Sequence, residues 1–461
     1  MKDVELKEVD QEKQLMTGQT QINGCVKVTV PENAGVKYTG LSKDELIKIA
    51  STAGWVRTRW VLLVLFWFGW IGMLAGAIVI IVQAPRCKPI PEMNWWNEGP
   101  LYQISDVNEF SENGLKVEEK LDYINQMKVK GLVLGPIHTV QADQSSTLEL
   151  TSINPEFGSE SQLISLLDRA HRKGISIVLD LTPNYEGVSA WFNNAASVAE
   201  RLKVSADILK VKFDFRALGC LNVFLLMTFR ALMGSVTGLS ADDASHLLNQ
   251  SSVDLLLTGL PDPAEPGIRQ AQVIQILYAD HLQTSLGWSL SGRTLGSLAS
   301  RTPAAPIRLY QMLLFTLPGT PVFSAGDEVG LKAGVSTFLS FVLLTQTVQE
   351  ERTAVCDFFK ALSDLKGKER SLLHGEYISL HSSPTSLAFL RLWDQSERFL
   401  VALNWGNDSV TMTLTYSDLP AEARVRASTD TENLAVDSKV SVEKLELGPK
   451  QAVLLSYAFP G

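Results

Sequence analysis

The stretch SQLISLLDRAHRKGISIVLDL, residues 161–181, decides the fold of the larger part of this 461-residue chain. Its first half carries leucines at helical spacing, Leu163 and Leu166, and it stops at Gly174, the residue type that most often ends a helix. The second half, 175–181, is a short apolar run that is typical of a buried strand. A helix followed at once by a buried strand is one repeat of a βα architecture, so this stretch predicts a parallel sheet covered by helices.

The same alternation extends toward the N-terminus. Apolar runs predict strands at 101–104 and 131–137, and helical spacing predicts a helix over 117–127 and another over 161–173. Asp180 stands at the C-terminal end of the strand predicted over 175–181. Repeated βα units of this length indicate a domain of the α/β class.

Residues 61–82, VLLVLFWFGWIGMLAGAIVIIV, form a single long apolar stretch without charge or proline. As a helix the stretch would measure about 33 Å, against about 30 Å for the hydrocarbon core of a bilayer. A buried core helix is the alternative, but nothing charged offsets insertion here. About sixty polar residues precede the stretch, unlike a cleaved signal peptide. We therefore predict one transmembrane helix that is retained as a signal anchor.

Charge alone gives little information on orientation, because Lys48, Arg57 and Arg59 on one side of the span face Arg86 and Lys88 on the other.

Two N-glycosylation sequons indicate the orientation of the chain in the membrane. They begin at Asn249 and Asn407, and both follow the span. The sequence therefore predicts a single-pass type II protein with its C-terminal domain outside and its tail inside. Its cytosolic tail, residues 1–56, is rich in charged residues and is expected to be mostly disordered.

Two local motifs lie in and beside the span. The sequence Ser42-Lys-Asp-Glu45 predicts a capping box that opens a short helix containing Leu46. Within the span, Gly72 and Gly76 are four residues apart, a spacing that lets a second helix approach closely. We expect these glycines to form a helix-packing face inside the membrane.

The composition excludes several classes of function. A formal net charge of −9 argues against a nucleic-acid partner, which needs clustered Lys and Arg. The six histidines show no metal-ligand spacing, and there is no phosphate-binding or dinucleotide motif. We expect neither a metal nor another cofactor.

Of the four cysteines, Cys25 precedes the span, whereas Cys87, Cys220 and Cys356 follow it. Three cysteines on the oxidising side of a membrane leave at least one without a mate in its own chain. Cys87 is the strongest candidate, because it lies five residues past the apolar stretch. Cys220 is expected to be a buried core thiol, and Cys356 is expected to precede a helix.

Three segments together resemble the α-amylase family. They are 154–158 (NPEFG), 170–184 (AHRKGISIVLDLTPN) and 317–328 (LPGTPVFSAGDE). The resemblance implies a (β/α)₈ TIM-barrel-like domain over 99–372, after a neck at 83–98. The run RFLVALN at 398–404 resembles the antiparallel β-sandwich domain that follows this barrel in the family, here expected over 373–461.

The catalytic carboxylates of that family are not found in the sequence. Glycoside hydrolysis needs two of them at the C-terminal ends of barrel strands. The third strand should end in Asn-His, but this chain has Asn184-Tyr185, and 213–216 (FDFR) lacks the nucleophile motif. Asp180 and Asn184 are therefore interpreted as vestigial, and the pair Asp327-Glu328 as structural. We predict that the chain is not an enzyme.

Segments in all three parts also resemble the heavy-chain family of heteromeric amino-acid transporters. They are 54–60 (GWVRTRW), 84–87 (APRC), 179–185 (LDLTPNY) and 368–375 (KERSLLHG).

This resemblance implies a chaperone and anchor subunit that is disulfide-linked through Cys87 to a multi-pass light chain. It also implies transport of large neutral amino acids or cystine/glutamate exchange, contact with membrane lipid, and association with integrin β subunits. An adhesion or signalling receptor and a membrane-anchored glycoside hydrolase are the alternatives. Residues 203–241 and 335–355 depart from the family pattern, so strands four and five of the barrel are not identified.

Overall fold

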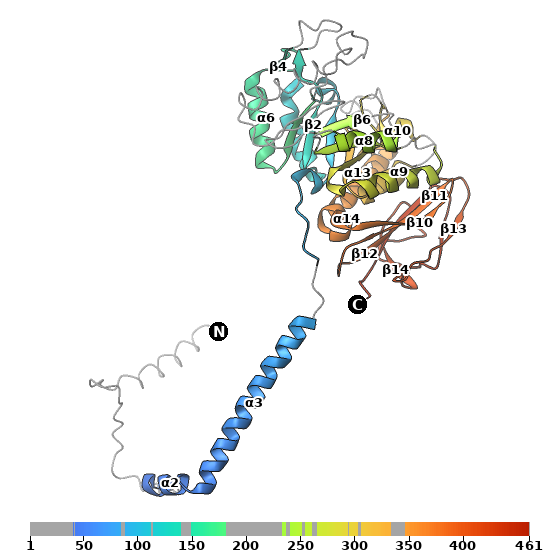
Figure 1. Cartoon of the computed structure of the whole chain (residues 1–461). Helices are drawn as coiled ribbons and strands as arrows, with labels where there is room; N and C mark the ends of the chain where they lie inside the picture. The colour runs from blue at the N-terminus through green and yellow to red at the C-terminus, as the bar shows by residue number, and fades with distance from the viewer. Residues whose placement is uncertain are drawn as a thin grey trace, which may run out of the picture. The chain divides into compact units, whose positions relative to one another are not determined.

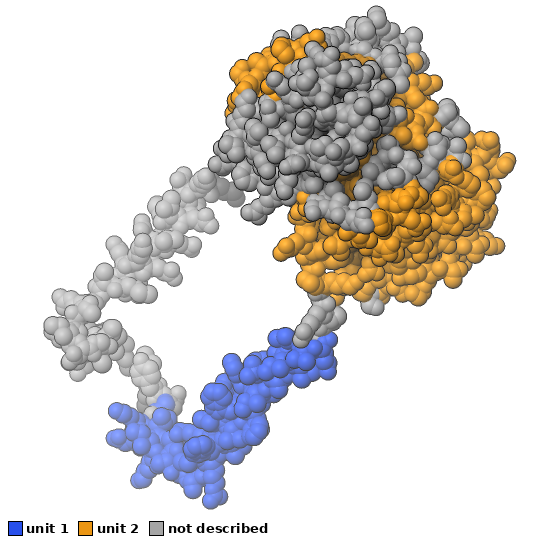
Figure 2. Space-filling view, turned by 45° about the horizontal axis from the view of Figure 1, so that its top comes forward, with its two compact units in different colours: residues 1–86 blue, residues 87–461 orange. Residues whose placement is uncertain are grey.

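The computed structural model describes residues 40, 42–83, 88–111, 114–139, 149–180, 233–236, 240–250, 254–260, 265–293, 295–302, 306–332 and 346–460. The chain divides into two compact units, residues 1–86 and residues 87–461 (Figure 2). Cys87, Asn184 and Cys220 lie outside the described residues, as does most of the cytosolic tail.

The described part of the first unit contains two helices, α2 (Lys43–Ala50) and α3 (Ala53–Gln83). The predicted capping box opens α2: the Glu45 backbone N–H donates to Ser42 Oγ at 3.4 Å, and the Ser42 backbone N–H donates to Glu45 Oε2 at 3.1 Å. Helix α3 has 31 residues and includes the whole apolar stretch 61–82. Among the described residues it is the one helix long and apolar enough to cross a membrane, with a mean hydropathy of 2.3.

The second unit is built on a parallel sheet of seven described strands in the order β5-β2-β1-β9-β8-β7-β6. The strands are β1 (Leu101–Ile104), β2 (Gly131–Leu134), β5 (Ser176–Leu179), β6 (Met233–Val236), β7 (Leu255–Gly259), β8 (Leu286–Ser289) and β9 (Thr320–Ser324). This is the strand order of a TIM barrel. Its two edges are β5 and β6, and residues 181–232 between them lie outside the described part.

Helices alternate with these strands along the chain (Figure 1). The helices in the described part of this unit are η1 (Trp95–Asn97), α4 (Val107–Ser111), η2 (Gly114–Lys120), α5 (Leu121–Gln126), α6 (Glu160–Arg172), α8 (Ala241–Gln250), α9 (Gly267–Asp280), η5 (Gln283–Ser285), α10 (Leu298–Arg301), α11 (Ile307–Thr316), α13 (Gln346–Lys368) and α14 (Arg370–His374). A small antiparallel pair, β3 (His138–Thr139) and β4 (Glu149–Ile153), follows β2. The strands predicted from apolar runs are confirmed, each at or inside its expected range.

The predicted helix over 161–173 is confirmed as α6, and Gly174 ends it with φ +69°, a conformation that favours glycine. The helix predicted over 117–127 is wrong in its first half. There the chain forms the 3₁₀ helix η2 before α5 begins. Its start is shaped by a tertiary contact, because the Leu115 backbone N–H donates to Phe157 O at 2.7 Å.

The C-terminal part is antiparallel. A six-stranded sheet has the order β10-β11-β12-β17-β14-β15, and β13 pairs with β16 in a second sheet. The strands are β10 (Glu376–Ser382), β11 (Ser386–Leu392), β12 (Arg398–Asn404), β13 (Val410–Thr413), β14 (Glu422–Ser428), β15 (Lys439–Ser441), β16 (Lys444–Leu447) and β17 (Gln451–Tyr457). Met412 and Leu445 from the small sheet share a core with Leu400 and Leu455 from the large one, as expected for a sandwich.

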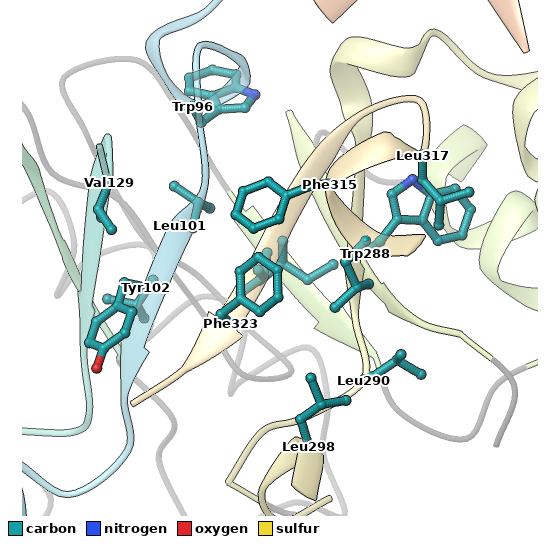
Figure 3. Close-up of a cluster of buried hydrophobic side chains, with 14 of the residues drawn as sticks. Trp96, Leu101, Tyr102, Val129, Trp288, Leu290, Leu298, Phe315, Leu317 and Phe323 are labelled. Atoms are coloured by element: carbon teal, nitrogen blue, oxygen red, sulfur yellow. The ribbon is translucent and has the colours of Figure 1, made fainter. Parts of the chain in front are cut away.

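The barrel core lies between the parallel strands and the helices that cover them. Figure 3 shows part of it, including Trp96, Tyr102, Trp288 and Phe323. The rings of Phe315 on α11 and Phe323 on β9 lie 4.9 Å apart between centroids. An aromatic side chain buries about 150–250 Å² in such a core.

One expectation about cysteine is corrected here. Cys356 does not precede a helix but lies within α13, which begins ten residues earlier at Gln346. The thiol is buried, with 6% of the residue exposed, beside Val329 and Leu331. The helix continues upstream because residues 346–355, which lack Pro and Gly, carry good helix formers such as Gln and Glu.

Candidate functional site

In a barrel enzyme the chemistry takes place at the C-terminal ends of the parallel strands. Among the described strand ends, Asp180 after β5 is the one carboxylate that immediately follows a strand. It is 2% exposed, and its backbone N–H donates to Leu134 O at 2.9 Å. Strand β8 is followed by Leu290, and β9 by Ala325. The described strand ends therefore do not supply the pair of carboxylates that glycoside hydrolysis requires.

The carboxylate of Asp327, in the loop after β9, is fully buried and hydrogen-bonded on both oxygens. Its Oδ1 accepts from the Leu298 backbone N–H at 2.9 Å. Its Oδ2 accepts from the Ser324 backbone N–H at 2.8 Å and from the Ser291 hydroxyl. Burial raises the pKa of Asp327 to about 7, although these hydrogen bonds oppose the shift. The carboxylate joins the loops that follow β8 and β9.

Glu328 is equally buried and accepts hydrogen bonds from a different set of donors. The hydroxyls of Tyr102 and Tyr123 donate to its Oε1 at 3.1 and 2.9 Å, and the Gly326 backbone N–H donates to its Oε2 at 2.9 Å. Burial raises the pKa of Glu328, and the same hydrogen bonds lower it. This arrangement supports the structural interpretation of the pair Asp327-Glu328.

The raised pKa of Asp327 makes a prediction about stability. Its folded value, about 7, lies above the ordinary 3.8. The group therefore contributes stability that is fully present below about pH 4 and is lost as the pH rises through about 7. Asn cannot titrate. The destabilisation caused by Asp327→Asn should shrink between pH 5 and pH 8, by at most about 1.4 kcal/mol per pH unit.

Urea unfolding of both proteins at several pH values measures this difference. Asp418→Asn is the matched control: Asp418 is half-buried, and its hydrogen bond with Arg398 lowers its pKa, so it stays ionised over the same range. A penalty for Asp327→Asn that stays constant with pH would contradict the assignment.

The neck packs against the N-terminal ends of the parallel strands. Trp96 and Asn97 are buried; both side chains donate to Thr284 O, at 3.2 and 3.0 Å. Asn97 Nδ2 also donates to the hydroxyl of Thr320, the first residue of β9, at 3.0 Å. Gly131, the first residue of β2, leaves room for the neighbouring tryptophan: a Cβ there would lie 2.6 Å from Trp95 Cζ3.

The neck is also attached to the antiparallel domain. Lys88 Nζ lies 2.7 Å from Glu376 Oε1, and the Lys88 backbone N–H donates to Asp394 Oδ2 at 3.0 Å. The ion pair is exposed, and such pairs contribute little to stability. The neck nevertheless contacts both domains of the second unit at defined positions.

Two buried basic side chains lie where the barrel meets the antiparallel domain. Lys366 and Arg391 are both 0% exposed. Lys366 Nζ donates to Leu317 O at 2.9 Å and to Leu372 O at 2.8 Å. These carbonyls belong to the C-terminal ends of α11 and α14, which are left without intrahelical partners.

Arg391 on β11 connects the antiparallel domain to the barrel, and we call Lys366, Arg391 and the carbonyls that they bind the joint. Its guanidinium donates to Thr316 O at 2.8 Å and to Gly375 O at 2.9 Å. Among the described residues, no carboxylate lies within ion-pair distance of Arg391 or Lys366, and burial lowers the pKa of both. Sequence reasoning missed this joint, because no local pattern distinguishes a buried Lys or Arg from a surface one.

The other predicted site residues are dispersed. Asn249, near the end of α8, and Asn407, in the turn after β12, are both exposed. Gly72 and Gly76 lie on α3, where a Cβ would meet no atom within 4 Å. Of the predicted site residues, only Asp180 is at a barrel strand end within the described part.

Comparisons with known proteins agree with this architecture. The family described as Solute carrier family 3 member 2 N-terminus matches residues 26–102, and the family Alpha amylase, catalytic domain matches residues 113–207. Among solved structures, an α-amylase of Anoxybacillus superposes with a TM-score of 0.57 at 16% identity, covering 80% of this chain and 99% of that one. At this identity the likeness shows the fold alone.

Sequence relatives are closer. The mouse protein "Amino acid transporter heavy chain SLC3A2" is 41% identical, covering 100% of this chain and 98% of that protein. The alignment runs over 521 positions against 461 residues here, so at least 60 positions hold no residue of this chain. The rat "Amino acid transporter heavy chain SLC3A1" is 22% identical over 93% of this chain. The 41% identity to the mouse protein over the full length places the chain in the family of amino acid transporter heavy chains.

Proposed function

We propose that this chain is the heavy subunit of a heteromeric amino-acid transporter and that it is disulfide-linked through Cys87 to a multi-pass light chain. In this role it brings the light chain to the plasma membrane, with the second unit outside the cell. The observation that carries the proposal is the 41% identity, over the whole length, to a protein named as an amino acid transporter heavy chain.

The chain's own residues support a non-enzymatic role. Asp180 is the one carboxylate directly after a described barrel strand, and Asp327 and Glu328 accept hydrogen bonds that hold loops together. A carboxylate that acts as acid, base or nucleophile must reach the substrate. The barrel is therefore proposed as a scaffold without hydrolase activity.

The cysteines favour Cys87 for the bridge. Cys356 is buried within α13 and burial raises the pKa of its thiol, so it is neither accessible nor readily ionised. Only residues 84–87 separate the end of α3 from Lys88, which contacts the antiparallel domain. A thiol in this short segment is close to the membrane surface, where the external loops of a multi-pass partner lie. Gly72 and Gly76 offer a second, non-covalent contact within the membrane.

Co-purification tests the proposal. Full-length chain isolated from cells under non-reducing conditions should carry a multi-pass transporter, and the complex should dissociate on the gel after reduction. The same preparation should release no glucose from maltooligosaccharides. Isolation without any multi-pass partner would favour an adhesion or signalling receptor, while sugar release abolished by Asp180→Ala would favour the hydrolase. Association with integrin β subunits stays a prediction.

The proposed orientation makes a prediction about glycosylation. Asn249 and Asn407 are both exposed and should carry N-linked glycans if the second unit is extracellular. Peptide N-glycosidase should increase the mobility of the chain on a gel. Asn249→Gln and Asn407→Gln should each remove one step of that shift, and the double variant should remove all of it. Ser417→Ala, in the antiparallel domain but outside both sequons, is the control. An unchanged mobility of the wild type would argue against this topology.

A further inference from the structure

Helix α2 has no role in the function proposed above, yet its stability needs an explanation. It has eight residues, Lys43–Ala50, and none of them is buried. Its large apolar side chains are strongly exposed: Leu46 56%, Ile47 55% and Ile49 42%. Isolated helices shorter than about 12–15 residues are marginal in water. A surface outside the described chain must therefore cover α2 if the helix is to persist.

The exposed side chains share one face. At 100° per residue, Leu46, Ile47, Ile49 and Ala50 fall within an arc of about 160°. Asp44, Glu45 and Lys48 occupy the opposite side of the helix, whereas Lys43, in the first turn, falls within the apolar arc, where its long side chain can extend toward headgroups.

On the polar side of α2, Glu45 is hydrogen-bonded to the residue that caps the helix. The hydroxyl of Ser42 donates to Glu45 Oε2 at 2.9 Å, so the capping box fixes where α2 begins. A charged face opposite a broad apolar face is the pattern of a helix that lies along an interface.

The place of α2 in the chain identifies that interface. Only Ser51 and Thr52 separate it from α3, and Figure 1 shows α2 turned away from the axis of α3. The first two turns of α3, before the apolar stretch 61–82, carry two tryptophans and two arginines. Trp and basic residues gather where a membrane helix passes from hydrocarbon into the headgroups. Helix α2 is thus tethered within a few residues of the membrane surface.

We propose that α2 lies on the membrane, with Leu46, Ile47 and Ile49 inserted at the boundary between lipid headgroups and acyl chains. The short link to α3 keeps the local concentration of lipid high, so even a weakly binding helix stays bound. Lys48, Arg57 and Arg59 suit anionic headgroups, which attract basic residues next to a span. The polar face with Asp44 and Glu45 then points to water. The proposal concerns lipid alone and does not depend on the light chain.

Amide hydrogen exchange in lipid nanodiscs tests the proposal. Full-length chain without a light chain is placed in phosphatidylcholine discs and in discs containing phosphatidylserine. Exchange is measured for the peptide covering 43–50. In both discs the amides of α2 should exchange about tenfold more slowly, or more, than in the variant Leu46→Ser/Ile47→Ser/Ile49→Ser. The slowing should be greater with phosphatidylserine.

Asp44→Ser is the matched control on the polar face and should keep the slow exchange. The single variant Leu46→Ser should give a smaller change in the same direction, and it serves if the triple variant is not recovered. Fast exchange in the wild type, or protection that the serine variants retain, would overturn the proposal. Protection that appears only after a light chain is added would assign the apolar face to a protein partner instead.

Discussion

Cys87→Ser is expected to remove the covalent heterodimer completely, as seen by the loss of the high-mass band on a non-reducing gel. The reason is chemical: serine cannot form a disulfide, and Cys356, the candidate thiol in the described part of the chain, is 6% exposed inside α13. A disulfide requires the two Cβ atoms to approach within about 4.5 Å, which a thiol buried in a core cannot offer to another chain.

Non-covalent association should survive this change. The face containing Gly72 and Gly76 is unaffected, so cross-linking or co-purification in mild detergent should still recover the light chain. Cys356→Ser is the control and should leave the band intact. If the band persisted in Cys87→Ser and vanished in Cys356→Ser, the wrong thiol would have been assigned.

Arg391→Met is expected to cause the largest loss of stability in the second unit, about 3–5 kcal/mol in the free energy of unfolding. Methionine fills much of the same volume but donates no hydrogen bond. Thr316 O and Gly375 O would each lose a buried donor, now at 2.8 and 2.9 Å. The contact between α11 and β11 would weaken with them. Burial lowers the pKa of Arg391 to about 10, because desolvation disfavours the charged guanidinium.

Thermal unfolding of the full-length protein, followed by circular dichroism, measures the effect as a fall of several degrees. Arg424→Met is the matched control in the same domain: Arg424 is 56% exposed in an ion pair with Asp437, and such pairs are worth about 0–1 kcal/mol. Equal effects from the two variants would show that the joint does not hold the domains together.

Local patterns predicted the elements whose signals are local. Strand β5 follows from the apolar run that begins at Ile175, and the end of α6 follows from Gly174, since both depend on residues close in sequence. The capping box at Ser42 is another such case. Helix η2 was missed because its geometry depends on Phe157, some forty residues away.

The joint and the neck contacts could not be predicted for a related reason. Arg391 and Thr316 are 75 residues apart, and Asn97 and Thr320 are 223 apart. Hydrogen bonds over such distances are set by how whole elements pack, and the residue types involved are common on surfaces. The vestigial character of the strand ends stays a prediction, which rests on contiguous family motifs whose absence can be seen directly in the sequence.

The length of α3 bears on where in the cell this protein resides. Its apolar stretch 61–82 would measure about 33 Å as a straight helix, close to the hydrocarbon thickness of about 32–33 Å in sterol-rich plasma membranes. The endoplasmic reticulum bilayer is thinner, at about 27 Å, so the same helix must tilt or stretch the lipid there. Each ångström of mismatch costs a fraction of a kcal/mol. By thickness alone, the stretch 61–82 would fit a sterol-rich plasma membrane with less mismatch than the endoplasmic reticulum bilayer.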